Sequence, residues 1–205
     1  MTRKEKIISF AWQHLLLFVA LYVMTLGIAA CVKSMLGASV ISVLPYVFHD
    51  AGTGGLTPSL TIGQYTFIIL LSWLQPEAIW EKAVAQLAGC TILAAGIALE
   101  VRCGSVTMPG EGFPVAISKV TGIEFPKVKI VVDVSLVLLG IVFCYIFFGK
   151  WQWHIIGVGT LFAMYYVGWA VRIASHHLKW FDRLLKYRPG FRRYIYGLAR
   201  YIYRK

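Results

Sequence analysis

Two acidic residues are informative in this sequence because each occurs where acids are rare. Asp133 interrupts the apolar run 130–148, and Glu111 lies in the glycine-bounded stretch GEGFPVAISKVTG at 110–122. An ionisable side chain inside an apolar segment is by default a candidate for a substrate pathway. Each acid also has a structural explanation. Lys129 precedes Asp133 by four residues and can pair with it at the membrane interface, and a carboxylate in the first turn of a helix is favoured by the helix dipole.

The remaining candidates for a substrate pathway are small, kinked or hydroxyl-bearing residues near these acids or in a similar earlier segment. They are Gly37, Ser39, Pro45, Gly110, Gly112 and Ser118. Catalysis is not expected, because no nucleophile–base set and no phosphate-binding loop is present. The four cysteines are scattered and His176-His177 has no further ligand nearby, so we expect buried small cysteines, no metal site and no cofactor.

The composition predicts that these residues are positioned by membrane-spanning helices. Hydrophobic residues make up 59% of the 205-residue chain, charged residues make up 14%, and the mean hydropathy is +0.70. A soluble domain has about 25% charged residues. Four apolar runs have about the 17–25 residues that a helix needs to cross a bilayer, namely 15–32, 83–99, 130–148 and 155–171. We expect an all-α polytopic membrane protein with four to five transmembrane helices, short re-entrant or interfacial helices and a C-terminal amphipathic helix.

A fifth apolar run, LTIGQYTFIILLSWL at 60–74, is short for a crossing and partly polar. If it does not cross and the N-terminus is cytoplasmic, most lysines and arginines fall on the cytoplasmic side, as the positive-inside rule requires. We therefore expect a short, non-crossing helix there. The chain is interpreted as a multi-pass protein of the bacterial inner membrane with both termini in the cytoplasm. The basic start MTRKEK is followed by a full-length span without a cleavage motif, which predicts a retained first helix.

The C-terminal stretch FRRYIYGLARYIYRK at 191–205 has its apolar and aromatic residues at helical spacing on one face. Its arginines lie away from that face, at Arg192, Arg193, Arg200 and Arg204. This pattern predicts an interfacial amphipathic helix that binds anionic lipid head groups of the bilayer. Nucleic-acid binding is disfavoured because the aromatics fall on the apolar face. The expected domains are a membrane domain at 1–173 and a basic cytoplasmic tail at 174–205.

A weak internal repeat relates 26–74 to 95–148. Each copy has a small-residue helix end with Gly-Ile-Ala, then a basic residue, then a glycine-initiated apolar segment of about a dozen residues. With four crossings the copies are inverted, an arrangement that recurs in secondary transporters with broken helices. The segment 110–122 is thus expected to be a re-entrant half-helix, and a helix lying flat on the membrane is the alternative. In the re-entrant case Val115 and Ile117 are buried and Glu111 or Ser118 faces a wet cavity.

The stretches MTLGIAACVKSMLGASVISVLPYVFHDAGTGGLTPSLTIGQYT and GIALEVRCGSVTMPGEGFPVAISKVTGIEFPKVKIVVDVSLVLLG resemble the YitT/YczE-type bacterial integral membrane proteins, a group of unknown function. The resemblance implies more crossings than this chain offers. After TIGQYT the chain passes quickly to FIILLSWLQPEAIW, as though parts of two helices were missing. The resemblance implies no substrate, cofactor or catalytic residue. We expect a small-solute transporter or a transporter-like subunit. The alternative is a membrane interaction or assembly protein, and homo-oligomers are left open.

Overall fold

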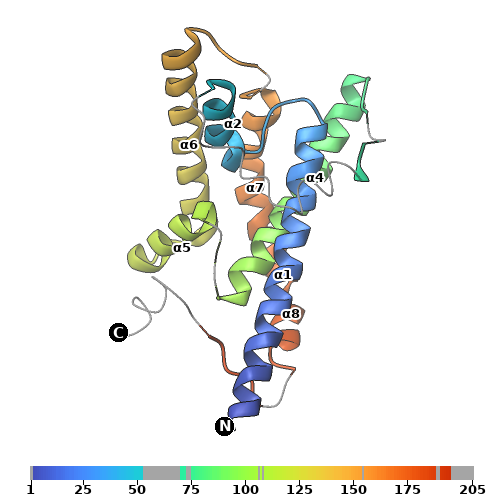
Figure 1. Cartoon of the computed structure of the whole chain (residues 1–205), viewed down its shortest axis with the longest axis vertical. Coiled ribbons are helices and arrows are strands. Elements are labelled where there is room, and N and C mark those ends of the chain that lie inside the picture. The colour runs from blue at the N-terminus through green and yellow to red at the C-terminus, as the bar shows by residue number, and fades with distance from the viewer. Residues whose placement is uncertain are drawn as a thin grey trace.

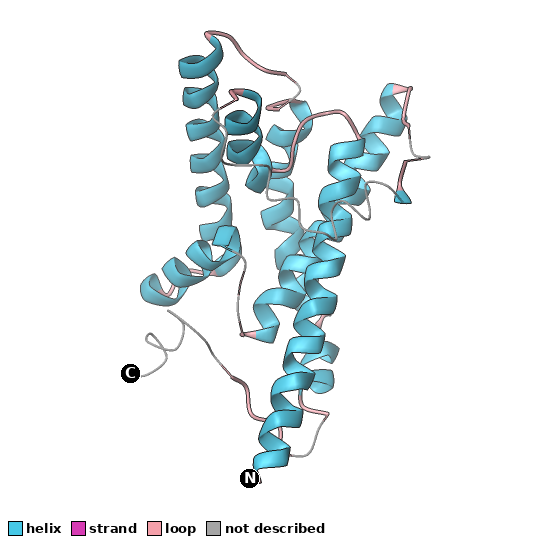
Figure 2. Cartoon of the chain, viewed as in Figure 1, coloured by secondary structure: helices cyan, strands magenta, loops and turns pink. Residues whose placement is uncertain are grey.

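The computed structural model of the chain describes residues 2–52, 70–72, 75–105, 107, 109–153, 155–187 and 190–194. Every regular element in this part of the chain is helical, and no strand occurs there (Figure 2). In chain order the elements are α1 (Arg3–Lys33), the 3-10 turn η1 (Val40–Ser42), α2 (Val43–Asp50), α4 (Ile79–Cys103), α5 (Pro109–Thr121), α6 (Phe125–Phe148), α7 (Val158–His177) and α8 (Lys179–Leu185). Of the expected short helix at 60–74, residues 70–72 are described, and the remainder lies outside the described residues.

Three of the described helices, α1, α4 and α6, are long and apolar enough to cross a membrane, with 31, 25 and 24 residues. The chain is therefore a helical membrane protein. These helices contain three of the four predicted spans. The fourth, 155–171, corresponds to α7, which begins at Val158 and continues to His177. The domain boundary expected after residue 173 thus falls inside a helix.

Local sequence explains several helix ends. α1 begins with a capping box in which the Thr2 hydroxyl accepts from the Glu5 N–H and the Glu5 carboxylate accepts from the Thr2 N–H. α4, α5 and α6 are each followed by a glycine in the left-handed conformation, with φ of +62° at Gly104, +72° at Gly122 and +63° at Gly149. Glycine adopts this conformation without steric cost and so stops a helix.

α1 and α4 form an antiparallel pair with closely approaching backbones. A Cβ on Gly96 would lie 2.6 Å from Met24 Cα, and one on Gly27 would lie 2.4 Å from the Leu93 nitrogen. Positions along α1 rise as the contacted positions along α4 fall, so the helices run in opposite directions. Side chains larger than hydrogen cannot be accommodated at these glycines, which is the usual basis of close helix packing in membranes.

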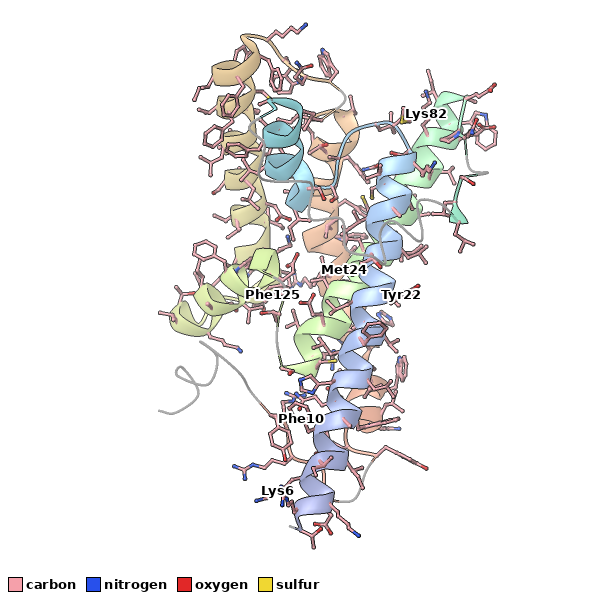
Figure 3. All side chains as sticks on the ribbon, viewed as in Figure 1. Lys6, Phe10, Tyr22, Met24, Lys82 and Phe125 are labelled. Carbon is pink, nitrogen blue, oxygen red and sulfur yellow. The ribbon has the colours of Figure 1, made fainter. Side chains whose placement is uncertain are left out.

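The other helices extend this pair into a layered bundle. α4 contacts α1 on one side and α7 on the other, and α7 contacts α6. The short helices α2 and α5 both pack against α6. Figure 1 shows α1 ending and α4 beginning at the same end of the molecule, and it shows the N-terminal ends of α2 and α5 turned toward its middle. The longest axis of the bundle runs from Lys6, near the start of α1, toward Lys82, near the start of α4 (Figure 3).

The start of the expected C-terminal amphipathic helix is not helical, which corrects the prediction for residues 191–194. Side chains of α1 bind this segment instead. The Ser9 hydroxyl bonds both the N–H and the carbonyl of Arg192, and the Gln13 amide bonds both backbone groups of Tyr194. These bonds take the backbone groups that a helix would use internally. The rest of the tail, including Arg200 and Arg204, lies outside the described residues.

Candidate functional site

The two informative acids of the sequence lie together around one lysine. Lys129 Nζ lies 2.5 Å from Asp133 Oδ1 and 3.2 Å from Glu111 Oε1. All three residues are buried, with exposed fractions of 2% for Lys129 and 1% for each acid. We call these three residues the acid–lysine triad. The expected i,i+4 pair of Lys129 and Asp133 on α6 is therefore present. It is buried inside the protein, and Lys129 also contacts a second carboxylate, that of Glu111 on α5.

α5 and α6 bring the triad together because they are joined by the short Gly122 turn and pack against each other, with α5 lying across the lower end of α6 in Figure 1. Glu111 lies in the first turn of α5, where the helix dipole favours a negative charge. Lys129 and Asp133 lie one turn apart on the buried face of α6. Pro114, also buried, lies inside α5 beyond its first turn, so it offers no N–H to the carbonyl of Gly110 four residues earlier. The local sequence thus places an acid at the inner end of α5, directly opposite the cation of α6.

The triad lines a small cavity at the centre of the bundle. Its other walls are apolar and include Met24 of α1, Ile41 of η1, Leu93 of α4 and Val167 of α7. Figure 3 shows Met24 about halfway along the molecule, at nearly the height of Phe125 at the start of α6. About 10 Å³ is open to the centre of a water molecule, which is room for one water.

The N-terminal ends of the two short segments meet at this cavity. A Cβ on Gly110 of α5 would lie 2.1 Å from Ile41 Cδ1 in η1, the turn that leads into α2. Ile41 lines the cavity together with Glu111, the residue after Gly110. Gly110 therefore allows the beginning of α5 to approach the beginning of α2. The two short segments thus lie in contact where Ile41 of the first meets Gly110 of the second.

The predicted residues of the first segment shape the turn before η1. Gly37 has a φ of +126°, and a Cβ there would lie 2.7 Å from the Gly157 nitrogen. Ser39 is buried, and its hydroxyl lies 2.9 Å from that of Ser42. Both residues therefore support the turn and do not line the cavity. Pro45 lies in α2, and its side chain is outside the described residues.

The predicted residues of the second segment divide between its two ends. A Cβ on Gly112 would lie 3.0 Å from Thr107 Oγ1, so this glycine allows the tight start of α5. The Ser118 hydroxyl donates to the Ile123 carbonyl at 2.6 Å, at the opposite end of the helix. Glu111 faces the cavity and Ser118 does not, while Val115 and Ile117 are half-buried. Of the two residues expected as alternatives at a cavity, Glu111 lies at this one, whereas the Ser118 hydroxyl binds the turn that follows α5.

The sequence interpretation missed a second buried polar cluster, which lies between α1, α4 and α7. The Gln86 amide nitrogen donates to the Gly159 carbonyl at 3.0 Å, and its oxygen accepts from the Ser34 hydroxyl at 2.6 Å. Cys31 and Cys90 lie beside it with their sulfurs 3.8 Å apart. A glutamine inside an apolar run was the available signal, because amides within membrane helices bond across helices. This cluster is fully bonded, which indicates a structural role.

A third polar region lies at the end of the bundle where α4 finishes. Arg102 pairs with Asp182 of α8 and donates to the Ser175 carbonyl of α7. Arg193 donates to the Arg102 carbonyl at 2.8 Å and so satisfies the C-terminal end of α4. The predicted lipid-facing arginines that fall in the described part therefore take part in protein contacts, Arg193 by its side chain and Arg192 by its backbone.

The acid–lysine triad is the strongest candidate for a functional site. With all three groups ionised it carries one net negative charge in an apolar setting, and such charges inside membrane proteins mark ion and substrate paths. Within the described residues, no group of three or more histidine, cysteine and acidic side chains is placed to hold a metal ion. The arrangement is suited to holding and releasing a positive charge.

Comparison with known proteins gives a family and no assigned activity. No curated protein and no solved structure matches the chain. The pattern of a family described as "Family of unknown function (DUF6198)" matches residues 11–71 and 66–176. The two matches cover all of α1, except its first turns, and continue through nearly all of α7. They overlap at 66–71, within the stretch that the sequence interpretation treated as a fusion of helix remnants. The chain therefore belongs to DUF6198, a family of unknown function.

Proposed function

We propose that this protein is a small-solute transporter whose path passes between the N-terminal ends of α2 and α5. The observation that carries the proposal is the acid–lysine triad, buried at the cavity where these two ends meet. Irregular backbone within a membrane is tolerated only where it is buried in protein or lines a cavity. Secondary transporters build their central sites from such interrupted segments.

We further propose four crossings, α1, α4, α6 and α7, with both termini in the bacterial cytoplasm. The antiparallel contact of α1 with α4 supports this topology, because a single crossing by 60–74 would leave the two helices parallel. The bonds from Ser9 and Gln13 to the C-terminal segment support a common side for the two ends of the chain. Lysines and arginines are concentrated at both ends, which the positive-inside rule assigns to the cytoplasm.

Two narrower proposals follow from the sequence. We propose that the part of the tail beyond Tyr194, with Arg200 and Arg204, binds anionic lipid head groups by charge attraction. We also propose a relationship to the YitT/YczE-type proteins in which this chain has lost parts of two helices. The overlap of the two family matches at 66–71 supports a shortened chain, because a deletion brings the flanking parts of the pattern onto the same residues.

Access to the cavity from both sides of a membrane tests the transport proposal. Ile41→Cys is made in a background without the four native cysteines, and the protein is placed in sealed vesicles of known orientation. A small charged thiol reagent added on either side is expected to reach the new thiol, because a transporter opens its central site alternately to both sides. A reagent too bulky for the cavity is expected to react slowly from each side.

Two control positions calibrate the reaction. Trp153→Cys, exposed between α6 and α7, reports full reaction from one side, and Val131→Cys reports the reaction of an exposed position on α6 that does not line the cavity. Reaction of Ile41→Cys from one side only, or from neither side, would contradict transport. It would favour the alternative of a membrane assembly protein with a sealed core.

A further inference from the structure

The charges around the cavity do not balance. One lysine faces two carboxylates, and the walls contributed by α1, η1, α4 and α7 supply only apolar side chains, among them Met24, Ile41, Leu93 and Val167. A net charge in such surroundings is costly unless a partner compensates it. One additional positive charge would make the site neutral.

The place for this additional positive charge is at the Glu111 carboxylate. Its Oε1 contacts Lys129, whereas its Oε2 is buried and has no hydrogen-bond partner in the described part of the chain. Asp133 also contacts the lysine, and neither of its oxygens is among the buried atoms of the described residues that lack a hydrogen-bond partner. The missing charge is therefore expected on Glu111.

A proton fits this position better than a metal ion does. Lys129 Nζ already occupies the place between the two carboxylates where a metal would bind. A hard cation takes about six oxygen ligands, and the described walls of the cavity provide carboxylate oxygens alone. A proton needs only the free lone pair of Glu111 Oε2. The resulting O–H then needs one acceptor, and the cavity has room for one water molecule that can serve as one.

We propose that the acid–lysine triad is a proton-binding site, in which Glu111 carries one exchangeable proton while Asp133 and Lys129 remain an ion pair. Taken with the proposed function, on which this part of the inference rests, the proton moves together with the solute. Protonation makes the site neutral and allows the cavity to close around it. Deprotonation restores the net negative charge and favours a hydrated, open cavity.

The test uses dicyclohexylcarbodiimide, an apolar reagent that modifies carboxyl groups in their protonated form when they are buried. The intact wild-type protein in vesicles is treated over a range of pH, and the modified residue is located by peptide mass spectrometry. Modification is expected at Glu111 and should fall about tenfold for each unit of pH on the alkaline side of the transition, as the protonated fraction does. Sodium or potassium should not protect the site.

Internal controls make the result specific. Glu124 is exposed and paired with Lys127 at the surface, so it should remain unmodified under the same conditions. Glu111→Gln should lose the modification without shifting it to Asp133. Modification of Asp133 alone, no dependence on pH, or protection by an alkali ion would each overturn the proposal, and protection would identify a metal-cation site instead.

This result is separable from the transport test. Dependence of Glu111 modification on pH without two-sided access at Ile41→Cys would leave a proton site in a protein that does not transport. Two-sided access with no modification of Glu111 would leave a transporter in which the proton has no part.

Discussion

Gln13 binds the backbone of Tyr194 at both its donor and its acceptor, although the two residues lie 181 positions apart. The amide nitrogen of Gln13 donates to the Tyr194 carbonyl at 3.0 Å, and its oxygen accepts from the Tyr194 N–H at 2.8 Å. One helical turn earlier, Ser9 contacts Arg192 in the same two-point manner. Four helical residues rise about 6 Å, and two extended residues span about 6.6 Å, so the two repeats match. Ser9 and Gln13 bind only backbone groups of Arg192 and Tyr194. These four hydrogen bonds therefore do not depend on which side chains the two residues carry.

Gln13→Leu is expected to release the C-terminal segment. It removes the two hydrogen bonds to Tyr194, each worth about 1 kcal/mol, so the open fraction of the segment should rise roughly thirtyfold. It also removes the bond from the Gln13 amide nitrogen to the Cys103 carbonyl, which lies in α4 and does not hold the segment. The measurement is the rate of trypsin cleavage after Arg192 and Arg193 in detergent-solubilised protein. Phe18→Leu, on an exposed part of α1, is the matched control and should leave the rate unchanged. An unchanged rate in Gln13→Leu would show that other contacts hold the segment.

Lys129→Met is expected to destabilise the protein by about 3–5 kcal/mol, because it leaves two buried carboxylates without a cation. Replacing all three charges by neutral groups of similar shape, in the variant Glu111→Gln, Lys129→Met, Asp133→Asn, should recover most of that loss. The free energies of unfolding in detergent are compared. If the triple variant were as unstable as Lys129→Met, the loss would arise from shape and not from charge.

The substitution Gly27→Ala changes stability in opposite directions through helix propensity and through packing, so the sign of the measured change shows which of the two dominates. In an isolated helix, alanine is more stable than glycine by about 0.5–1 kcal/mol. In this protein the new methyl group would lie 2.4 Å from the Leu93 nitrogen, so we expect destabilisation by about 1–3 kcal/mol through forced separation of α1 and α4. Thermal unfolding in detergent measures the effect. A stabilised Gly27→Ala would mean that the two helices do not approach at this glycine.

The sequence predicts the membrane helices well because length and hydropathy alone decide them. The three long helices contain three of the four predicted spans, and Gly122, the glycine that bounds the stretch 110–122, follows the end of α5. The partner of Asp133 was also readable, because Lys129 lies four residues before it on the same helix face.

Contacts between segments far apart in the chain could not be predicted from the sequence pattern of either segment. The recruitment of Glu111 to the ion pair depends on the angle between α5 and α6, which the sequence of neither helix specifies. Residues 191–194 have helical periodicity, yet Ser9 and Gln13 bind their backbone in another conformation. The sequence left Glu111 and Ser118 as alternatives at a cavity, because periodicity does not say which end of a short helix points inward.

The glycine contact between α1 and α4 divides the molecule into a stiff frame and a part that can be displaced. Helices whose backbones touch cannot slide or tilt without collision, because no flexible side chain separates them. Across the cavity, Ile41 meets Gly110 through the terminal methyl group of a side chain, which can change rotamer. If α1 and α4 stay together, the cavity widens through movement of the other elements that line it, η1 with α2, α5, α6 and α7, and the Gly122 turn is the nearest hinge for α5.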